Sequence, residues 1–69
     1  MSTLVTQLKR YRLIANMSQD ELAKKVNVRR ETIVRLEGGK YNPSIKLAFD
    51  IAKVFNVTIE EIFTYESIN

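Results

Sequence analysis

The chain has 69 residues, a formal net charge of +3 at pH 7, and neither cysteine nor histidine. This composition excludes disulfides, thiolate or imidazole metal sites, and catalysis by a cysteine nucleophile or a histidine base. Because the sequence has no linker-like run and no apolar run of membrane-spanning length, we expect one cytoplasmic domain over residues 1–69 that uses no cofactor, metal or membrane.

The first predicted helix covers about residues 7–15. Thr6 is its expected N-cap, and Leu8 and Leu13 are expected on its apolar side. Asn16 is expected to end the helix in the left-handed conformation, because asparagine adopts positive φ more readily than most residues.

The segment SQDE, residues 18–21, is typical of a capping box and predicts a second helix of about two turns. In this motif the Ser18 hydroxyl accepts from the Glu21 backbone amide, while the Glu21 carboxylate accepts from the Ser18 amide. Asn27 is the candidate for a left-handed residue after this helix. The apolar residues at helical spacing are Leu22, Ala23 and Val26.

A third helix is predicted over residues 30–37, and the glycine pair at 38–39 is expected to end it. Ile33 and Leu36 are expected to point inward. Arg29 stands where serine or threonine would cap the free amides, so this helix is expected to start without a side-chain cap.

Pro43 and the N-cap candidate Ser44 predict a fourth helix that ends at about Phe55. Its apolar arc is unusually wide, which leaves two interpretations open. Either part of it, around Phe49 and Val54, packs on a second copy of the chain together with the C-terminal segment FTYESI, or the helix is buried at the centre of the fold. The polar residues of this helix are Lys46, Asp50 and Lys53.

The segment TIEE, which starts at Thr58, predicts a fifth short helix through Phe63. Five short helices make the expected fold all-α. The β-propensity of TLV near residue 4 and FTY near residue 64 leaves open whether the two ends pair as short strands.

Residues 18–37 meet the steric requirements of a helix-turn-helix motif. Ala23 allows the two helices to approach, Asn27 allows the sharp reversal, and Ile33 anchors the second helix against the first. That second helix lies in a basic part of the chain, since residues 24–40 include six basic and two acidic side chains. The motif therefore predicts insertion of the helix over residues 30–37 into a DNA major groove.

The segment MSQDELAKKVNVRRETIVRLEGGKYNPSIKLAFDIAKVFNVTIEEIF resembles the phage Cro and lambda-repressor type of helix-turn-helix regulators. The likeness includes the S-Q-x-E-L-A opening, the I-x-x-L-E-x-G-K end of the third helix, P-S, and L-A-x-x-I-A. In length the chain is similar to the short stand-alone subgroup of the cytolysin operon repressor. The resemblance implies a compact five-helix DNA-binding domain that acts as a dimer without a separate effector domain.

The resemblance also assigns roles to residues of the third helix. Arginine can donate two parallel hydrogen bonds to guanine O6 and N7, and Glu31 can accept from cytosine N4. The alternative is that Glu31 interacts with the helix dipole and the arginines are solvated. Arg29 departs from the small hydroxyl residue that the family usually has at this position. The implied base-reading residues are Arg29, Arg30, Glu31 and Arg35.

A second set of positions matches the family's contacts to the DNA backbone. For Tyr41, packing in the core is the alternative to a phosphate contact. Arg12 and Glu37 match a partly buried ion pair between the first and third helices, which is structural. The implied phosphate-contacting residues are Gln19, Thr32, Lys40, Tyr41 and Asn42.

An enzyme is excluded, because the adjacent carboxylates at 20–21 and 60–61 fall in capping boxes and no nucleophile or phosphate-binding loop accompanies them. The expected function is sequence-specific binding of double-stranded DNA by a homodimeric transcriptional repressor on an inverted-repeat operator. Residues 56–69 are the expected dimerisation segment, and no small-molecule ligand is expected. The alternative is an antitoxin-like or adaptor module that binds protein through its apolar surface.

Overall fold

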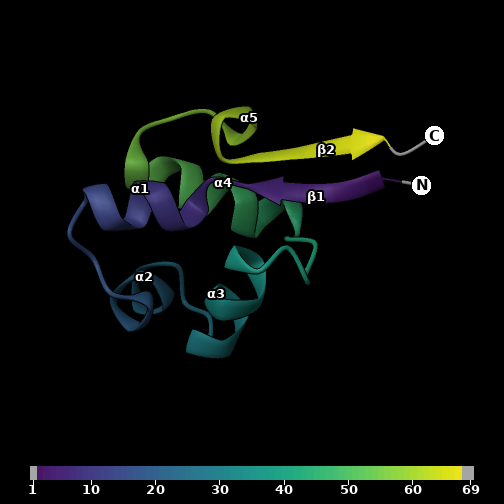
Figure 1. The fold of residues 1–69 in the computed structure, drawn as a ribbon. Coiled ribbons are helices and arrows are strands. Elements are labelled where there is room, and N and C mark those ends of the chain that lie inside the picture. The colour runs from purple at the N-terminus through teal and green to yellow at the C-terminus, as the bar shows by residue number, and fades with distance from the viewer. Residues whose placement is uncertain (1, 68–69) are drawn as a thin grey trace.

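The computed structural model describes residues 2–67 and contains the five predicted helices (Figure 1). The expected all-α class is incomplete, because the two ends of the chain also form a two-stranded antiparallel sheet. Residues 68 and 69, which belong to the predicted dimerisation segment, lie outside the described residues. The elements in chain order are β1 (Ser2–Thr6), α1 (Leu8–Ile14), α2 (Gln19–Lys25), α3 (Arg30–Glu37), α4 (Ile45–Phe55), α5 (Ile59–Ile62) and β2 (Phe63–Ser67).

The segments near residues 4 and 64 do pair as short strands, and β1 and β2 lie side by side in Figure 1. Thr6 pairs with Phe63 and Leu4 pairs with Tyr65. The prediction that the fifth helix includes Phe63 is wrong, because α5 ends at Ile62 and Phe63 has the extended dihedrals φ −122° and ψ 126°. The Phe63 amide donates to the Ile59 carbonyl, but the extended backbone pairs with β1 and the phenyl ring is buried, which outweighs the local helix signal.

Asparagine residues follow three of the helices in the left-handed conformation. Asn16 has φ 57° and Asn27 has φ 59°, which confirms both predictions, and Asn56 after α4 has φ 55°. At these positions asparagine avoids part of the steric penalty that other non-glycine residues would incur. Each of these reversals starts the connection to the next helix.

The helix starts follow the predicted capping chemistry with two changes. Only half of the expected Thr58–Glu61 capping box forms, because the Glu61 carboxylate accepts from the Tyr11 hydroxyl at 3.4 Å and not from the Thr58 amide. The Ser18–Glu21 capping box is present, and its hydrogen bonds to Ser18 hold the pKa of the Glu21 carboxyl below its ordinary value. The Ser44 and Thr58 hydroxyls accept from the amides three residues later. Thr6 does not occupy the N-cap of α1, which is at Gln7, but its hydroxyl accepts from the Leu8 amide at 3.1 Å.

The first helix presents a different inward face from the expected one. Leu8 is fully buried, but Leu13 is 57% exposed, so the prediction that both lie on the apolar side is wrong. Leu13 follows Leu8 by five residues, which places the two side chains about 140° apart around the helix axis. The other buried side chain of α1 is that of Arg12, which lies one turn further along the helix.

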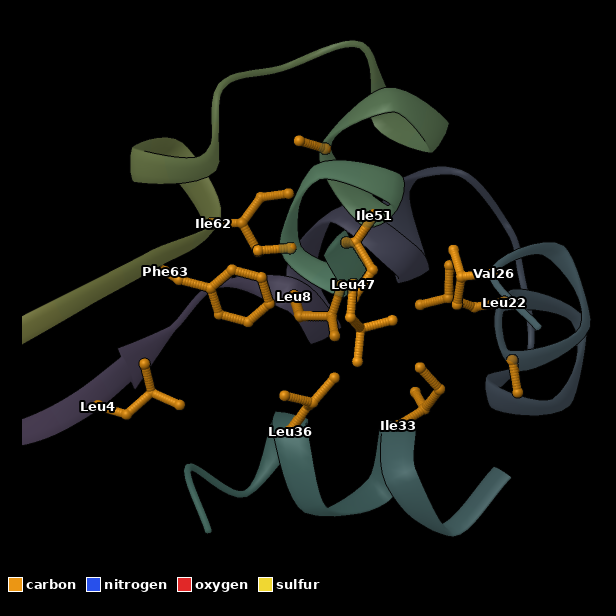
Figure 2. Close-up of a cluster of buried hydrophobic side chains, with 13 residues drawn as sticks. Leu4, Leu8, Leu22, Val26, Ile33, Leu36, Leu47, Ile51, Ile62 and Phe63 are labelled. Atoms are coloured by element: carbon orange, nitrogen blue, oxygen red, sulfur yellow. The ribbon is translucent and has the colours of Figure 1, made fainter. Parts of the chain in front are cut away.

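The hydrophobic core lies between the helices, with α4 on one side and α2 and α3 on the other (Figure 2). Leu22, Ile33, Leu36 and Ile51 are fully buried, and Leu4 extends the cluster into the sheet. The core therefore ties the helix-turn-helix segment to both ends of the chain. Its buried members are Leu4, Leu8, Leu22, Ala23, Val26, Ile33, Leu36, Leu47, Ala48, Ile51, Ala52, Ile62 and Phe63.

Gly39 lies in the loop after α3, close to the backbone of β1, at a position where a side chain would be strained. Its φ is +69°, and a Cβ atom there would lie 3.1 Å from the Leu4 carbonyl oxygen. We expect Gly39→Ala to lower the free energy of unfolding by about 1–2 kcal/mol, measured by urea denaturation. Gly38→Ala is the matched control, since Gly38 has φ −82° and room for a methyl group. Its expected effect is between zero and a gain of about 1 kcal/mol, and equal losses in both variants would contradict this explanation.

Candidate nucleic-acid interface

The helix-turn-helix segment has the predicted internal geometry. Ala23 is 1% exposed and Ile33 is fully buried, so the two helices pack closely through these positions. Between them Asn27 takes the left-handed conformation, and the Val28 amide donates to the Ala23 carbonyl at 3.0 Å. This turn fixes α3 at an angle to α2 and leaves the first turn of α3 facing solvent (Figure 1).

The predicted base-reading residues share the solvent side of α3. Arg29, at the N-cap, and Arg30, Glu31 and Arg35, within the helix, are all exposed. Among residues 2–67, none of these four side chains takes part in a hydrogen bond or a salt bridge. Arg29 also makes no capping bond, as expected. Three guanidinium groups and one carboxylate are thus available for an external partner.

Val34 also belongs to this surface, although it was not among the predicted site residues. It is 45% exposed and follows Arg30 by four residues and Glu31 by three, so it lies on the same side of α3. The signal was present in the sequence, because in a regular helix Val34 lies about 160° from Leu36, which faces the core.

The predicted phosphate-contacting residues fall into two groups. Lys40, Tyr41 and Asn42 follow α3, and all three are exposed. The Asn42 Oδ1 accepts from the hydroxyl of Tyr65 on β2 at 3.2 Å, so the sheet contacts this loop. Tyr41 is 40% exposed and lies outside the core cluster, which removes the alternative of core packing.

The second group consists of Gln19 and Thr32, which are both half-buried. Gln19 is the first residue of α2, and its Nε2 donates to Glu37 Oε1 at 3.1 Å. The side chain of Gln19 is thereby held between the start of α2 and the end of α3. Thr32 lies instead in the first turn of α3.

The predicted ion pair between Arg12 and Glu37 is confirmed. Arg12 Nε donates to Glu37 Oε2 at 2.6 Å, and the side chains are only 8% and 5% exposed. Arg12 Nη1 also donates to the Met17 carbonyl oxygen at 2.9 Å. The hydrogen bond with Glu37 raises the pKa of the Arg12 guanidinium above its ordinary value, although burial opposes that shift. Together with Gln19, this pair joins α1, the start of α2 and the end of α3.

The wide apolar arc of the fourth helix is divided between the core and the solvent-exposed surface. One face is in the core, but Ile45 is 77% exposed and Phe49 is 53% exposed. Beside Phe49 a surface groove of about 400 Å³ extends to the start of α5. Val54 is half-buried against the core. The residues that line this groove include Phe49, Ala52, Lys53, Val57, Ile59 and Glu60.

Within residues 2–67, no helix is long and apolar enough to cross a membrane. The same part of the chain has no group of three or more histidine, cysteine, aspartate or glutamate side chains arranged to hold a metal ion.

Comparison with known proteins identifies the family. Residues 8–62 match the helix-turn-helix family. An uncharacterized helix-turn-helix transcriptional regulator of Archaeoglobus fulgidus is 62% identical over 61 residues, which cover 88% of this chain and 86% of that protein. Another from Methanocaldococcus jannaschii is 58% identical over 60 residues, which cover 87% of this chain and 91% of that protein.

A solved structure agrees on the fold. The clp gene regulator ClgR from Corynebacterium glutamicum superposes with a TM-score of 0.72 over 78% of this chain, at 20% sequence identity. This chain spans 57% of the length of that ClgR chain. The family and the relatives are helix-turn-helix transcriptional regulators and not enzymes, which confirms the prediction that this chain is not an enzyme. The chain belongs to the Cro/C1-type helix-turn-helix family of transcriptional regulators.

Proposed function

We propose that this protein is a homodimeric repressor that inserts α3 into the major groove of an inverted-repeat DNA operator. The observation that carries this proposal is the set of exposed, unpaired charged side chains on the outward face of α3. Arg30 and Arg35 would donate to guanine edges, and Glu31 would accept from cytosine N4. Arg29, at the start of the helix, would reach the neighbouring base or phosphate.

Contacts to the DNA backbone would hold α3 in register. Lys40, Tyr41 and Asn42 would meet one strand after the end of α3. Gln19, at the start of α2, would present its free amide N–H to a further phosphate, and Thr32 its hydroxyl to another. These contacts carry little sequence information, so they supply affinity and orientation while the face of α3 supplies specificity.

Dimerisation would use the exposed part of α4. Ile45 and Phe49 are large apolar side chains that contact solvent in the single chain, and the adjacent groove is flanked by Lys53 and Glu60. Under twofold symmetry, Phe49 of each copy would enter the groove of the other, and Lys53 would face Glu60. Two α3 helices would then enter major grooves about 34 Å apart, and the bound dimer would block access to the promoter.

Selection from a random duplex library, combined with sedimentation equilibrium, tests this proposal. Enrichment of an inverted repeat by a protein of dimer mass is the expected result. The competing function is an adaptor or antitoxin-like module that binds protein through Ile45 and Phe49. No enriched duplex, together with a stable protein complex that a Phe49→Ala variant loses, would favour the adaptor and overturn the repressor.

Lys40 provides a test of the backbone contacts. We expect Lys40→Ala to weaken binding to all operator sequences by a similar factor and to reduce the slope of log K against log salt by about 1. The measurement is fluorescence anisotropy across a salt series. Lys9→Ala, which removes an exposed lysine from α1, is the charge-matched control and should leave the slope near that of the wild type. A Lys40 variant with an unchanged slope would contradict the phosphate contact.

A further inference from the structure

Val34 has no evident role in folding although it lies on the central helix of the site. It is 45% exposed, while the adjacent Ile33 and the next inward residue Leu36 are fully buried and anchor α3 to the core. A β-branched residue is also a weaker helix former than alanine or leucine. The packing of α3 therefore gives no reason for valine at this exposed position.

The neighbours of Val34 place it among the proposed base-reading groups. With 3.6 residues per turn, Val34 is about 40° from Arg30 and about 60° from Glu31 around the helix axis. Both neighbours are exposed. A DNA helix that meets Arg30 and Glu31 in its major groove must also meet the Val34 side chain.

The chemistry of valine restricts what it can recognise there. Its side chain neither donates nor accepts a hydrogen bond, so it adds nothing to the reading of guanine, cytosine or adenine by polar groups. The apolar group on the edge of a base pair in the major groove is the C5-methyl of thymine. In a helix valine strongly prefers one rotamer, so holding it against a methyl group costs little further side-chain entropy.

We propose that Val34 determines specificity for thymine by packing its methyl groups against the C5-methyl of one thymine in each operator half-site. This inference rests on the proposed function. It adds a nonpolar contact with a base to the hydrogen bonds proposed for the charged side chains of α3. Burying one methyl-sized group is worth about fourfold in affinity, or about 0.8 kcal/mol.

Thymine-to-uracil replacement tests the contact, because it deletes only the methyl group of the base. In the selected operator, each thymine of one half-site is replaced singly, and wild-type and Val34→Ala proteins are titrated by fluorescence anisotropy. At one position the wild type should lose about fourfold in affinity. Val34→Ala should bind the thymine operator about fourfold more weakly than the wild type and lose nothing further with uracil.

Two controls separate the contact from a structural effect. Ile14→Ala removes an exposed aliphatic side chain from α1 and should keep the full wild-type sensitivity to the thymine methyl. The thermal midpoint of Val34→Ala should be no lower than that of the wild type, since the side chain lies outside the core cluster and alanine is the better helix former.

The outcomes distinguish this inference from the proposed function beneath it. If an operator is enriched but Val34→Ala keeps the wild-type sensitivity at every thymine, Val34 makes no such contact and the repressor proposal stands. If no thymine replacement changes wild-type affinity, the inference is equally overturned. If no duplex is enriched at all, the repressor proposal itself fails.

Discussion

Replacing Arg12 with methionine should lower the free energy of unfolding by about 3–5 kcal/mol, because it leaves the Glu37 carboxylate buried without its cation. The Glu37 side chain is 5% exposed and would keep only the hydrogen bond from Gln19. Small domains have a total stability of about 5–15 kcal/mol, so this single change would leave a substantial unfolded population at 37 °C. Urea denaturation followed by circular dichroism measures the loss.

Two further variants decide whether the charge imbalance is the cause. The double variant Arg12→Met with Glu37→Met removes both charges and should be more stable than Arg12→Met alone. Lys46→Met breaks the exposed pair with Asp50, whose Nζ–Oδ2 distance is 2.7 Å, and should cost no more than about 0.5 kcal/mol. Similar losses for Arg12→Met and Lys46→Met would show that burial of the first pair has no energetic consequence.

The order and positions of the helices were predictable because their signals are local. Ser18, Ser44 and Thr58 each accept a hydrogen bond from an amide only three residues away. Asn16 and Asn27 are also local signals, because each occupies a backbone position with positive φ. Such signals involve one turn of chain, so they can be recognised without knowing what packs against them.

The errors occur where distant segments decide the outcome. Phe63 is in a strand because it pairs with Thr6, which no local pattern encodes. Leu13 is exposed because Arg12 takes the inward position, where Glu37 from another helix compensates its charge. The strand register, and with it the hydrogen bond between Tyr65 and Asn42 across 23 residues, likewise depends on the assembled fold.

In the candidate site, too, local features were predictable and contacts between distant segments were not. The exposure of Arg30, Glu31 and Arg35 follows from helix periodicity once Ile33 and Leu36 are assigned to the core. The roles assigned to individual residues came instead from the family resemblance. The link from Gln19 to Glu37 could not be predicted, because it depends on the angle between two helices. Val34 could have been found by applying the same periodicity to apolar residues as well as charged ones.

Arg35→Ala should lose about 1–3 kcal/mol of binding free energy to the preferred operator and relax the base preference at one position in each half-site. Arg35 lies on the outward face of α3, where its guanidinium can donate two parallel hydrogen bonds to guanine O6 and N7. Because this exposed side chain has no ion-pair partner within residues 2–67, its removal should leave the stability of the fold nearly unchanged. A repeat of the library selection with the variant measures the loss of preference.

A base analogue identifies the bonded atom. Replacing the guanine with 7-deazaguanine removes the N7 acceptor, so the wild type should bind more weakly while Arg35→Ala is indifferent at that position. Arg10→Ala removes another exposed arginine, from α1, and should retain the full preference. If Arg35→Ala weakens all base sequences equally and lowers the salt dependence, then Arg35 contacts phosphate. Recognition by α3 would in that case depend on Arg30, Glu31 and Val34 without a contribution from Arg35.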